Sequence, residues 1–112
     1  MTTGLFGPHP LTKKGIDDAV EKGGIGAYAL GSKSQEGGLI VERVGRSDFD
    51  LNNRLHDYEG QYTHFKYAFY PTKKAAYEKE CELYHDFSPR DNILHPDRPT
   101  GTDYTCPRNC GY

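Results

Sequence analysis

The sequence predicts a small α+β domain, in which helices flank a three-stranded antiparallel sheet and an irregular C-terminal tail follows. Three observations lead to this fold. Two apolar runs, 25–31 and 39–45, are joined by a glycine-rich loop, which favours a β-hairpin. A third run, 62–70, alternates apolar and polar side chains, and residues 73–87 follow helical spacing. A chain of 112 residues is long enough for one such domain.

Each element of the first half has a local signal. Residues 1–24 are interrupted by Gly and Pro, so we expect an N-terminal extension there with one short helix. The run "IGAYALG" is small and apolar, and "LIVERVG" is rich in β-branched residues, so both are typical of strands. The segment "LNNRLHDYE" fits a helix that ends at Gly60.

The second half completes the order strand, strand, helix, strand, helix, with the helices expected on one side of the sheet. Pro71 ends the alternating strand, and Thr72 is suited to cap the helix over 73–87. Residues 93–112 show no periodicity and too few apolar side chains for a core of their own. We therefore expect a tail that packs on the 25–92 domain or is partly disordered.

Composition and charge narrow the function classes. A net charge of −2 is unlike that of a high-affinity, non-specific DNA binder, so a nucleic-acid role needs a local basic patch or metal ions. No apolar run approaches the roughly 18 residues of a membrane span, and the N-terminus does not resemble a secretory signal. Three Cys, an odd number, argue against a disulfide framework and favour a reducing, cytoplasmic location.

Glu80 is the unusual residue of the long helix. At about 100° per residue, Glu78 and Glu82 fall on the solvent side, whereas Glu80 lies within the arc of apolar side chains. A carboxylate in that position costs free energy unless it is paired, hydrogen-bonded or bound to a cation. One explanation is an ion pair with Arg54, or a position at the edge of the apolar arc from which the carboxylate still reaches water. A metal-binding or catalytic carboxylate is the other.

Four short motifs follow one another between Gly26 and Asn92. "GAYAL" resembles the GIY element and "RVGRS" the YIG element of the GIY-YIG endonuclease superfamily. "LNNRL" resembles its helix arginine, and "AAYEKECELYHDFSPRDN" its glutamate helix with the following asparagine. Members of that family have a three-stranded antiparallel sheet flanked by helices, and they hydrolyse DNA phosphodiesters with a single divalent metal.

The resemblance implies a role for each matching side chain. Glu80 would hold Mg²⁺, or Mn²⁺, through a hard carboxylate oxygen. Arg54 would stabilise the charge that develops on the phosphate. Tyr28 would orient or deprotonate the attacking water, and Asn92 would support the sheet end on the substrate side.

One position departs from the family pattern, because Arg43 replaces the tyrosine that begins the second motif. An arginine cannot act as a base at neutral pH, although it can bind phosphate. Tyr58, four residues after Arg54 and on the same side of the helix, is one substitute. His56 has a suitable pKa, but it lies about 160° from Arg54 on the helix.

The sequence therefore predicts a metal-dependent endonuclease that acts on DNA, with RNA as the alternative nucleic acid. Arg43, Arg46 and Lys66 would form a basic cleft, which Asp48 and Asp50 dilute. With no second DNA-binding domain in the chain, recognition would come from this domain, an oligomer or an accessory partner. The alternative is a catalytically impaired module of the same fold that binds nucleic acid or a protein without cleaving.

The tail contains half of a zinc motif. Cys106 and Cys110 have the Cys-x3-Cys spacing, with His85 and His95 upstream, but zinc needs a second matched pair of ligands. Zinc is therefore not expected from this pattern. Cys81 falls in the apolar arc of the long helix and is interpreted as a core residue.

Overall fold

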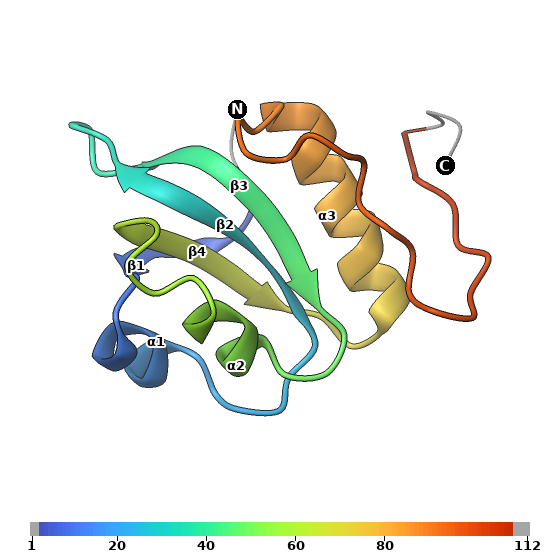
Figure 1. The fold of residues 1–112 in the computed structure, drawn as a ribbon, viewed down its shortest axis with the longest axis horizontal. Helices are drawn as coiled ribbons and strands as arrows, with labels where there is room; N and C mark the ends of the chain where they lie inside the picture. Colours follow the sequence, from blue (N-terminus) through green and yellow to red (C-terminus); the bar gives the residue numbers. More distant parts are fainter. Residues whose placement is uncertain (1–2, 109–112) are drawn as a thin grey trace.

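The computed structural model describes residues 3–108, which form one sheet with helices packed against it (Figure 1). The sheet has the strand order β1-β4-β2-β3, and every neighbouring pair is antiparallel. The predicted α+β class is confirmed. In chain order the elements are β1 (Phe6–Pro10), α1 (Lys13–Ala19), β2 (Gly26–Lys33), β3 (Leu39–Ser47), α2 (Leu51–His56), β4 (His64–Phe69) and α3 (Lys73–Phe87).

The sheet has four strands, so the prediction of three was wrong. The additional strand, β1, lies in the segment predicted as an extension and pairs with the outer side of β4. Its sequence, "FGPHP", was interpreted as turn-forming because of its Gly and Pro residues. A strand at the edge of a sheet tolerates Pro, since one side of its backbone needs no partner. Phe6 and His9 of β1 contact Tyr67 of β4 through their rings.

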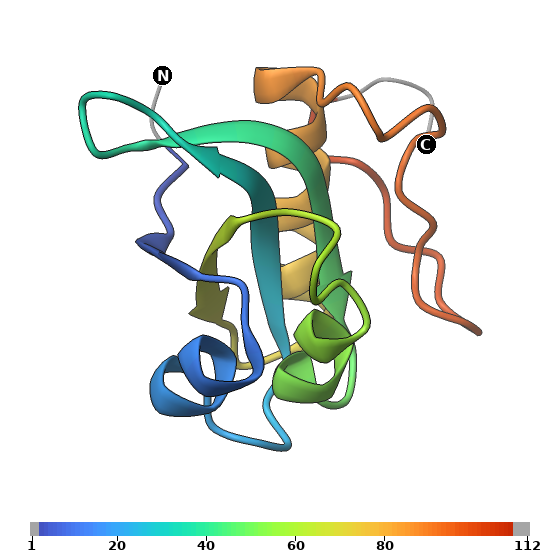
Figure 2. The ribbon, with the colours of Figure 1, turned by 60° about the vertical axis from the view of Figure 1, so that its left-hand side comes forward.

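The helices cover both faces of the sheet, so the expectation of helices on one side was also wrong (Figures 1 and 2). α1 and α2 cover the face where Tyr28, Leu30 and Phe65 are buried. α3 covers the other face, where Ala29 and Ala68 belong to a second core cluster. Their small side chains let α3 approach the sheet closely. The sequence pattern did not predict that a helix covers this second face.

α3 has the bounds that its spacing predicted. The Thr72 side chain caps it by accepting a hydrogen bond from the Ala75 amide. It ends at Ser88, which adopts the left-handed conformation with φ 42°. Because Ala76, Tyr77 and Leu83 are buried against the sheet and the tail, the whole helix is a fixed platform for Glu80.

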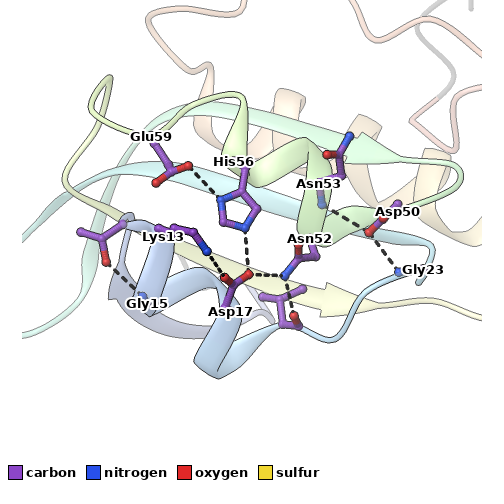
Figure 3. Close-up of polar contacts among 11 residues, drawn as sticks. Lys13, Gly15, Asp17, Gly23, Asp50, Asn52, Asn53, His56 and Glu59 are labelled. Atoms are coloured by element: carbon purple, nitrogen blue, oxygen red, sulfur yellow. Dashed lines mark hydrogen bonds and ion pairs between the residues drawn. The ribbon is translucent and has the colours of Figure 1, made fainter.

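A polar network joins α1 to α2 (Figure 3). The Asp17 carboxylate accepts hydrogen bonds from Asn52 at 3.1 Å, and it contacts His56 Nε2 at 2.9 Å. Asn52 also donates to the Val20 carbonyl at 2.8 Å, and it is 3% exposed. At the start of α2, the Asp50 side chain accepts from the Gly23 amide and so ties the α1–β2 loop to the cap. These contacts set the position of α2, which carries Arg54.

In the structure the tail is the segment that follows α3, described over residues 88–108; it crosses α3 and contains no helix or strand in that range (Figure 1). A small third core cluster attaches it, in which Cys106 packs against Tyr77 and Cys81 of α3. The predicted burial of Cys81 is confirmed. None of the helices within residues 3–108 combines the length and apolar content needed to cross a bilayer.

Candidate functional site

A polar groove of about 330 Å³ lies around the C-terminal half of β3, and it is open to solvent on one side. Its walls come from β2, β3, α2, α3 and the start of the tail. Three arginines and three carboxylates line it. Seven of the predicted site residues face this groove: Tyr28, Arg43, Arg46, Arg54, Tyr58, Glu80 and Asn92.

Tyr28 reaches the groove because its strand partner is a glycine. It lies opposite Gly45 in the β2–β3 ladder, and a Cβ at position 45 would collide with the Tyr28 hydroxyl. The bare backbone at Gly45 thus lets the Tyr28 ring lie flat across β3. Burial raises the pKa of Tyr28 well above its ordinary value, and neighbouring Tyr58 adds to the rise. Tyr28 is therefore a neutral phenol at neutral pH, able to donate a hydrogen bond.

Glu80 is held at the groove by an arginine, although not by the one expected. Arg46 Nη1 lies 2.6 Å from Glu80 Oε1, while Arg46 Nε lies 2.9 Å from Asp48 Oδ1. The side chains of Arg46 and Glu80 are each 11% exposed. The ion pair with Arg54, one of the explanations left open by the sequence, is not formed, because Glu80 pairs with Arg46 of β3 whereas Arg54 belongs to α2.

Burial raises the pKa of Glu80 from its ordinary value of 4.5 to about 7. Arg46 opposes this rise, whereas the nearby Asp48 and Asp97 carboxylates add to it. Among the described residues, only one Glu80 oxygen has a hydrogen-bond donor, so Oε2 retains its acceptor capacity. A buried carboxylate with a strongly raised pKa in a groove is the kind of group that active sites contain.

Arg54 contributes an uncommitted positive charge at the mouth of the groove. It is exposed, and its guanidinium forms no hydrogen bond or ion pair with any residue in 3–108. Its charge lowers the pKa of Tyr28, opposing the effect of burial. A guanidinium free of protein partners can bind an anion in the groove without first breaking an ion pair.

Arg43 is held by aromatic side chains. Its Nε donates to the Tyr62 hydroxyl at 3.1 Å, and its Cζ lies 5.6 Å from the centre of the Tyr58 ring. The Tyr58 ring in turn lies 5.9 Å from that of Tyr28. Tyr62 donates to Asp91, which places a negative charge behind the arginine. Arg43 is thus a fixed cation beside the two tyrosines that the sequence singled out.

Asn92 supports the sheet edge. Its side-chain oxygen accepts from the Val44 amide at 2.7 Å, and its nitrogen donates to the Val44 carbonyl at 3.0 Å. The side chain therefore acts as a one-residue strand partner for β3. This is the supporting role that was expected of it, and a substrate contact by Asn92 stays a prediction.

Two predicted residues lie elsewhere. Lys66 lies on β4 opposite Ala29 and does not line the groove. His56, the alternative base, belongs to the network between α1 and α2, where it contacts Asp17 and Glu59. Its position agrees with the helical-wheel argument against it.

The groove also contains residues that the sequence did not single out. Asp48 was noted only as a charge that dilutes the basic cleft, but it shares Arg46 with Glu80. The position of Asp48 two residues after Arg46 was a signal in the sequence that the two side chains could pair. Asp97 comes from the tail, where no periodicity indicated which side chains face the domain. Phe49 lines the groove while 75% exposed, and Lys73 lies over its ring.

Comparisons with protein-family models, curated proteins and solved structures found no match for this chain. The side chains that line the groove indicate its chemistry. Arginines can bind a phosphate there, a buried carboxylate can hold a divalent cation, and two adjacent phenols can orient a water molecule. Phosphoryl-group chemistry uses this combination of charges.

Proposed function

We propose that this protein is a GIY-YIG-like, divalent-metal-dependent endonuclease that hydrolyses DNA phosphodiester bonds in the groove. One observation carries the proposal: Tyr28 of β2, Arg54 of α2 and Glu80 of α3 line the same groove. They are distant in sequence, and each belongs to one of the sequence motifs described above. Shared lining of one small groove by side chains from three elements supports a common chemical task.

Glu80 is the residue that would hold the metal. A hard carboxylate oxygen suits Mg²⁺ or Mn²⁺, which keep several waters and need only one or two protein carboxylates. Glu80 Oε2 has the required acceptor capacity, since no described residue donates to it. When bound, the cation would act as a Lewis acid on the phosphate. Arg46, already shared between Glu80 and Asp48, would keep Asp48 as its partner.

The remaining residues act on the substrate and the water. Arg54 binds a phosphate oxygen and stabilises the charge that develops on it. Tyr28, a neutral phenol, orients the attacking water by a hydrogen bond, and Tyr58 lies beside it as the second phenol. Arg43 occupies the position of the family's second tyrosine and contributes charge for backbone binding.

Cleavage of supercoiled plasmid tests the proposal. The wild-type protein should nick the plasmid with Mg²⁺ or Mn²⁺ and not with chelator. Glu80→Ala and Arg54→Ala should each lower the rate by about 100-fold or more. Glu82→Ala, on the same helix, and Lys14→Ala, on α1, are matched controls that should cleave like wild type. Equal cleavage by all five proteins would contradict the assignment.

The impaired-module alternative rests on Arg43. Its hydrogen bond to Tyr62 and its contact with Tyr58 show a side chain that the surrounding residues accommodate well. If wild type leaves both DNA and RNA uncut while Arg43→Tyr cleaves them, the site is a decayed nuclease. If Arg43→Tyr instead abolishes nucleic-acid binding measured by fluorescence anisotropy, Arg43 contacts the ligand itself.

A further inference from the structure

Cys81 of α3 forms a second cluster with His95 and Cys106 of the tail. Each residue offers one ligand atom, and these atoms all lie within 4.8 Å of one another. Both cysteines are free thiols, at most 1% exposed, and His95 is 9% exposed. None of the three lines the groove of the proposed nuclease site. This buried cluster of two sulfurs and an imidazole is therefore separate from the proposed nuclease site.

The hydrogen bond of His95 to the main chain indicates which of its ring nitrogens is suited to bind a metal. Its Nδ1 lies 2.9 Å from the Pro96 carbonyl oxygen. A carbonyl can only accept, so Nδ1 carries the proton and Nε2 carries the lone pair. A histidine that binds a metal usually donates its other N–H to a carbonyl or carboxylate in this way.

The two sulfurs indicate which kind of cation this cluster would take. Thiolate and imidazole ligands select zinc over Mg²⁺ or Ca²⁺, which take oxygen.

His85 is the described residue placed to complete the set. It follows Cys81 by one helical turn, so both side chains leave the same side of α3. Its ring centre lies 5.4 Å from that of His95. Its Nε2 is buried and forms no hydrogen bond with any residue from 3 to 108. A ligand role for His85 requires a change of side-chain rotamer that turns this nitrogen toward the cluster.

We propose that Cys81, His85, His95 and Cys106 form a structural Zn²⁺ site that fastens the tail to α3. Such a site would add to the attachment of the tail, whose aliphatic side chains Ile93 and Leu94 are 87% and 80% exposed. The cluster around Cys106 is the core contact that it makes with the helix. This ligand set differs from the Cys106 and Cys110 spacing, from which zinc was not expected, and Cys110 lies outside the described residues.

Metal analysis of the full-length protein, purified under reducing conditions, tests the site. One zinc per chain is expected. After exchange with Co²⁺, the protein should show the intense visible absorption of tetrahedral cobalt and thiolate-to-cobalt charge transfer. Cys81→Ser, His85→Gln, His95→Gln and Cys106→Ser should each weaken Zn²⁺ binding by at least about 100-fold. Cys110→Ser and His64→Gln are matched controls that should bind like wild type.

Limited proteolysis separates loss of the metal from misfolding, and it needs no variant. Tyr104 lies between His95 and Cys106 and packs on the Cys106 cluster, so the proposed site closes a loop around it. Removing zinc from the wild type should speed chymotryptic cleavage after Tyr104 by about tenfold, and adding Zn²⁺ should reverse this. Cleavage after Phe49, in the β3–α2 loop, should not change.

Three results would overturn the site. Protein without zinc and without a Co²⁺ spectrum after reconstitution would exclude it. A Cys81–Cys106 disulfide found by mass spectrometry in protein purified without reductant would replace it by a redox pair. Loss of zinc in Cys110→Ser, together with full binding in His85→Gln, would refute the assigned ligand set.

Discussion

At the scale of single residues, Glu80 carries the clearest physical signature in the molecule. Its carboxylate is buried beside Arg46, and desolvation raises its pKa to about 7. The folded protein therefore holds a proton between pH 4.5 and about 7 that the unfolded chain releases. Where the folded state binds more protons, stability falls as pH rises. The protonated side chain thus contributes stability that is fully present below its ordinary pKa and is lost as pH rises through about 7.

We therefore expect Glu80 to make the fold less stable at about pH 8 than at about pH 5. At 1.36 kcal/mol per pKa unit, its contribution should fall by about 3 kcal/mol at most across that window. Glu80→Gln cannot ionise. The unfolding free energy of wild type minus that of this variant should therefore be lower at about pH 8 than at about pH 5, by up to that amount. Urea denaturation at both pH values, without added divalent metal, measures it.

Wild type must be compared with Glu80→Gln at each pH, because other groups titrate in the same pH range and change the stability of both proteins. The hydrogen bonds of His56 with Glu59 and Asp17 raise its pKa despite the effect of its burial, and this residue is present in both proteins. Glu82→Gln, on the same helix, controls for the loss of a carboxylate and should track wild type at both pH values. Parallel pH profiles for wild type and Glu80→Gln would show that Glu80 is not a buried acid.

At the scale of elements, short helices depend on contacts beyond their own backbone. α2 has six residues, fewer than an isolated helix needs to be stable. Leu51 and Leu55 bury its apolar side, and Asn52 ties it to α1. Arg54 belongs to this helix, so the position of the groove's free cation depends on that attachment.

Asn52→Ala should weaken the attachment of α2. The variant leaves the buried Val20 carbonyl without the hydrogen bond that Asn52 donates at 2.8 Å. An unsatisfied buried acceptor costs about 1–3 kcal/mol, which should appear as reduced unfolding free energy in urea denaturation. The neighbouring Asn53 is exposed, and its side chain makes no hydrogen bond within residues 3–108. Asn53→Ala should therefore change stability by less than about 0.5 kcal/mol. Equal losses in both variants would contradict the role of Asn52.

The elements also show what a sequence can and cannot specify. The helix over 73–87 was predicted with correct bounds because Pro71, Thr72 and its periodicity all act locally. β1 was missed because its stability comes from pairing with β4, which is 54 or more residues away in the ladder, and from ring contacts with Tyr67. Local turn signals in "FGPHP" do not report that non-local pairing.

In the groove, too, local features of the sequence could be predicted, whereas non-local contacts could not. Glu80 was identifiable because a charge inside an apolar arc is a local contradiction that only a partner can resolve. Its actual partner, Arg46, could not be predicted in place of Arg54, because the helical wheel shows that Glu80 needs a partner but not which one, and the packing of α3 on β3 determines it. Asp97 and the cluster around Cys106 come from an aperiodic tail, so no spacing rule could place them.

At the scale of the whole molecule, the tail closes an otherwise open edge of the sheet. β3 is the outer strand on the groove side, and Asn92 satisfies both backbone groups of Val44. The Asp91 amide adds a hydrogen bond to the Glu42 carbonyl at 2.9 Å. Covering an edge in this way removes a template for pairing with other chains. The tail therefore both protects β3 and forms a wall of the groove.

Asn92→Ala should open this edge. Both hydrogen bonds to Val44 are lost, and we expect unfolding free energy to fall by about 1–3 kcal/mol. The local effect is more diagnostic, because the Val44 amide donates to Asn92 at 2.7 Å. Its hydrogen exchange, followed by NMR, should accelerate by at least about tenfold, whereas β3 amides that face β2 should keep their protection. Ile93→Ala, at the next and 87% exposed position, should leave both quantities unchanged. An unaltered exchange rate at Val44 in Asn92→Ala would mean that the tail does not hold this edge in solution.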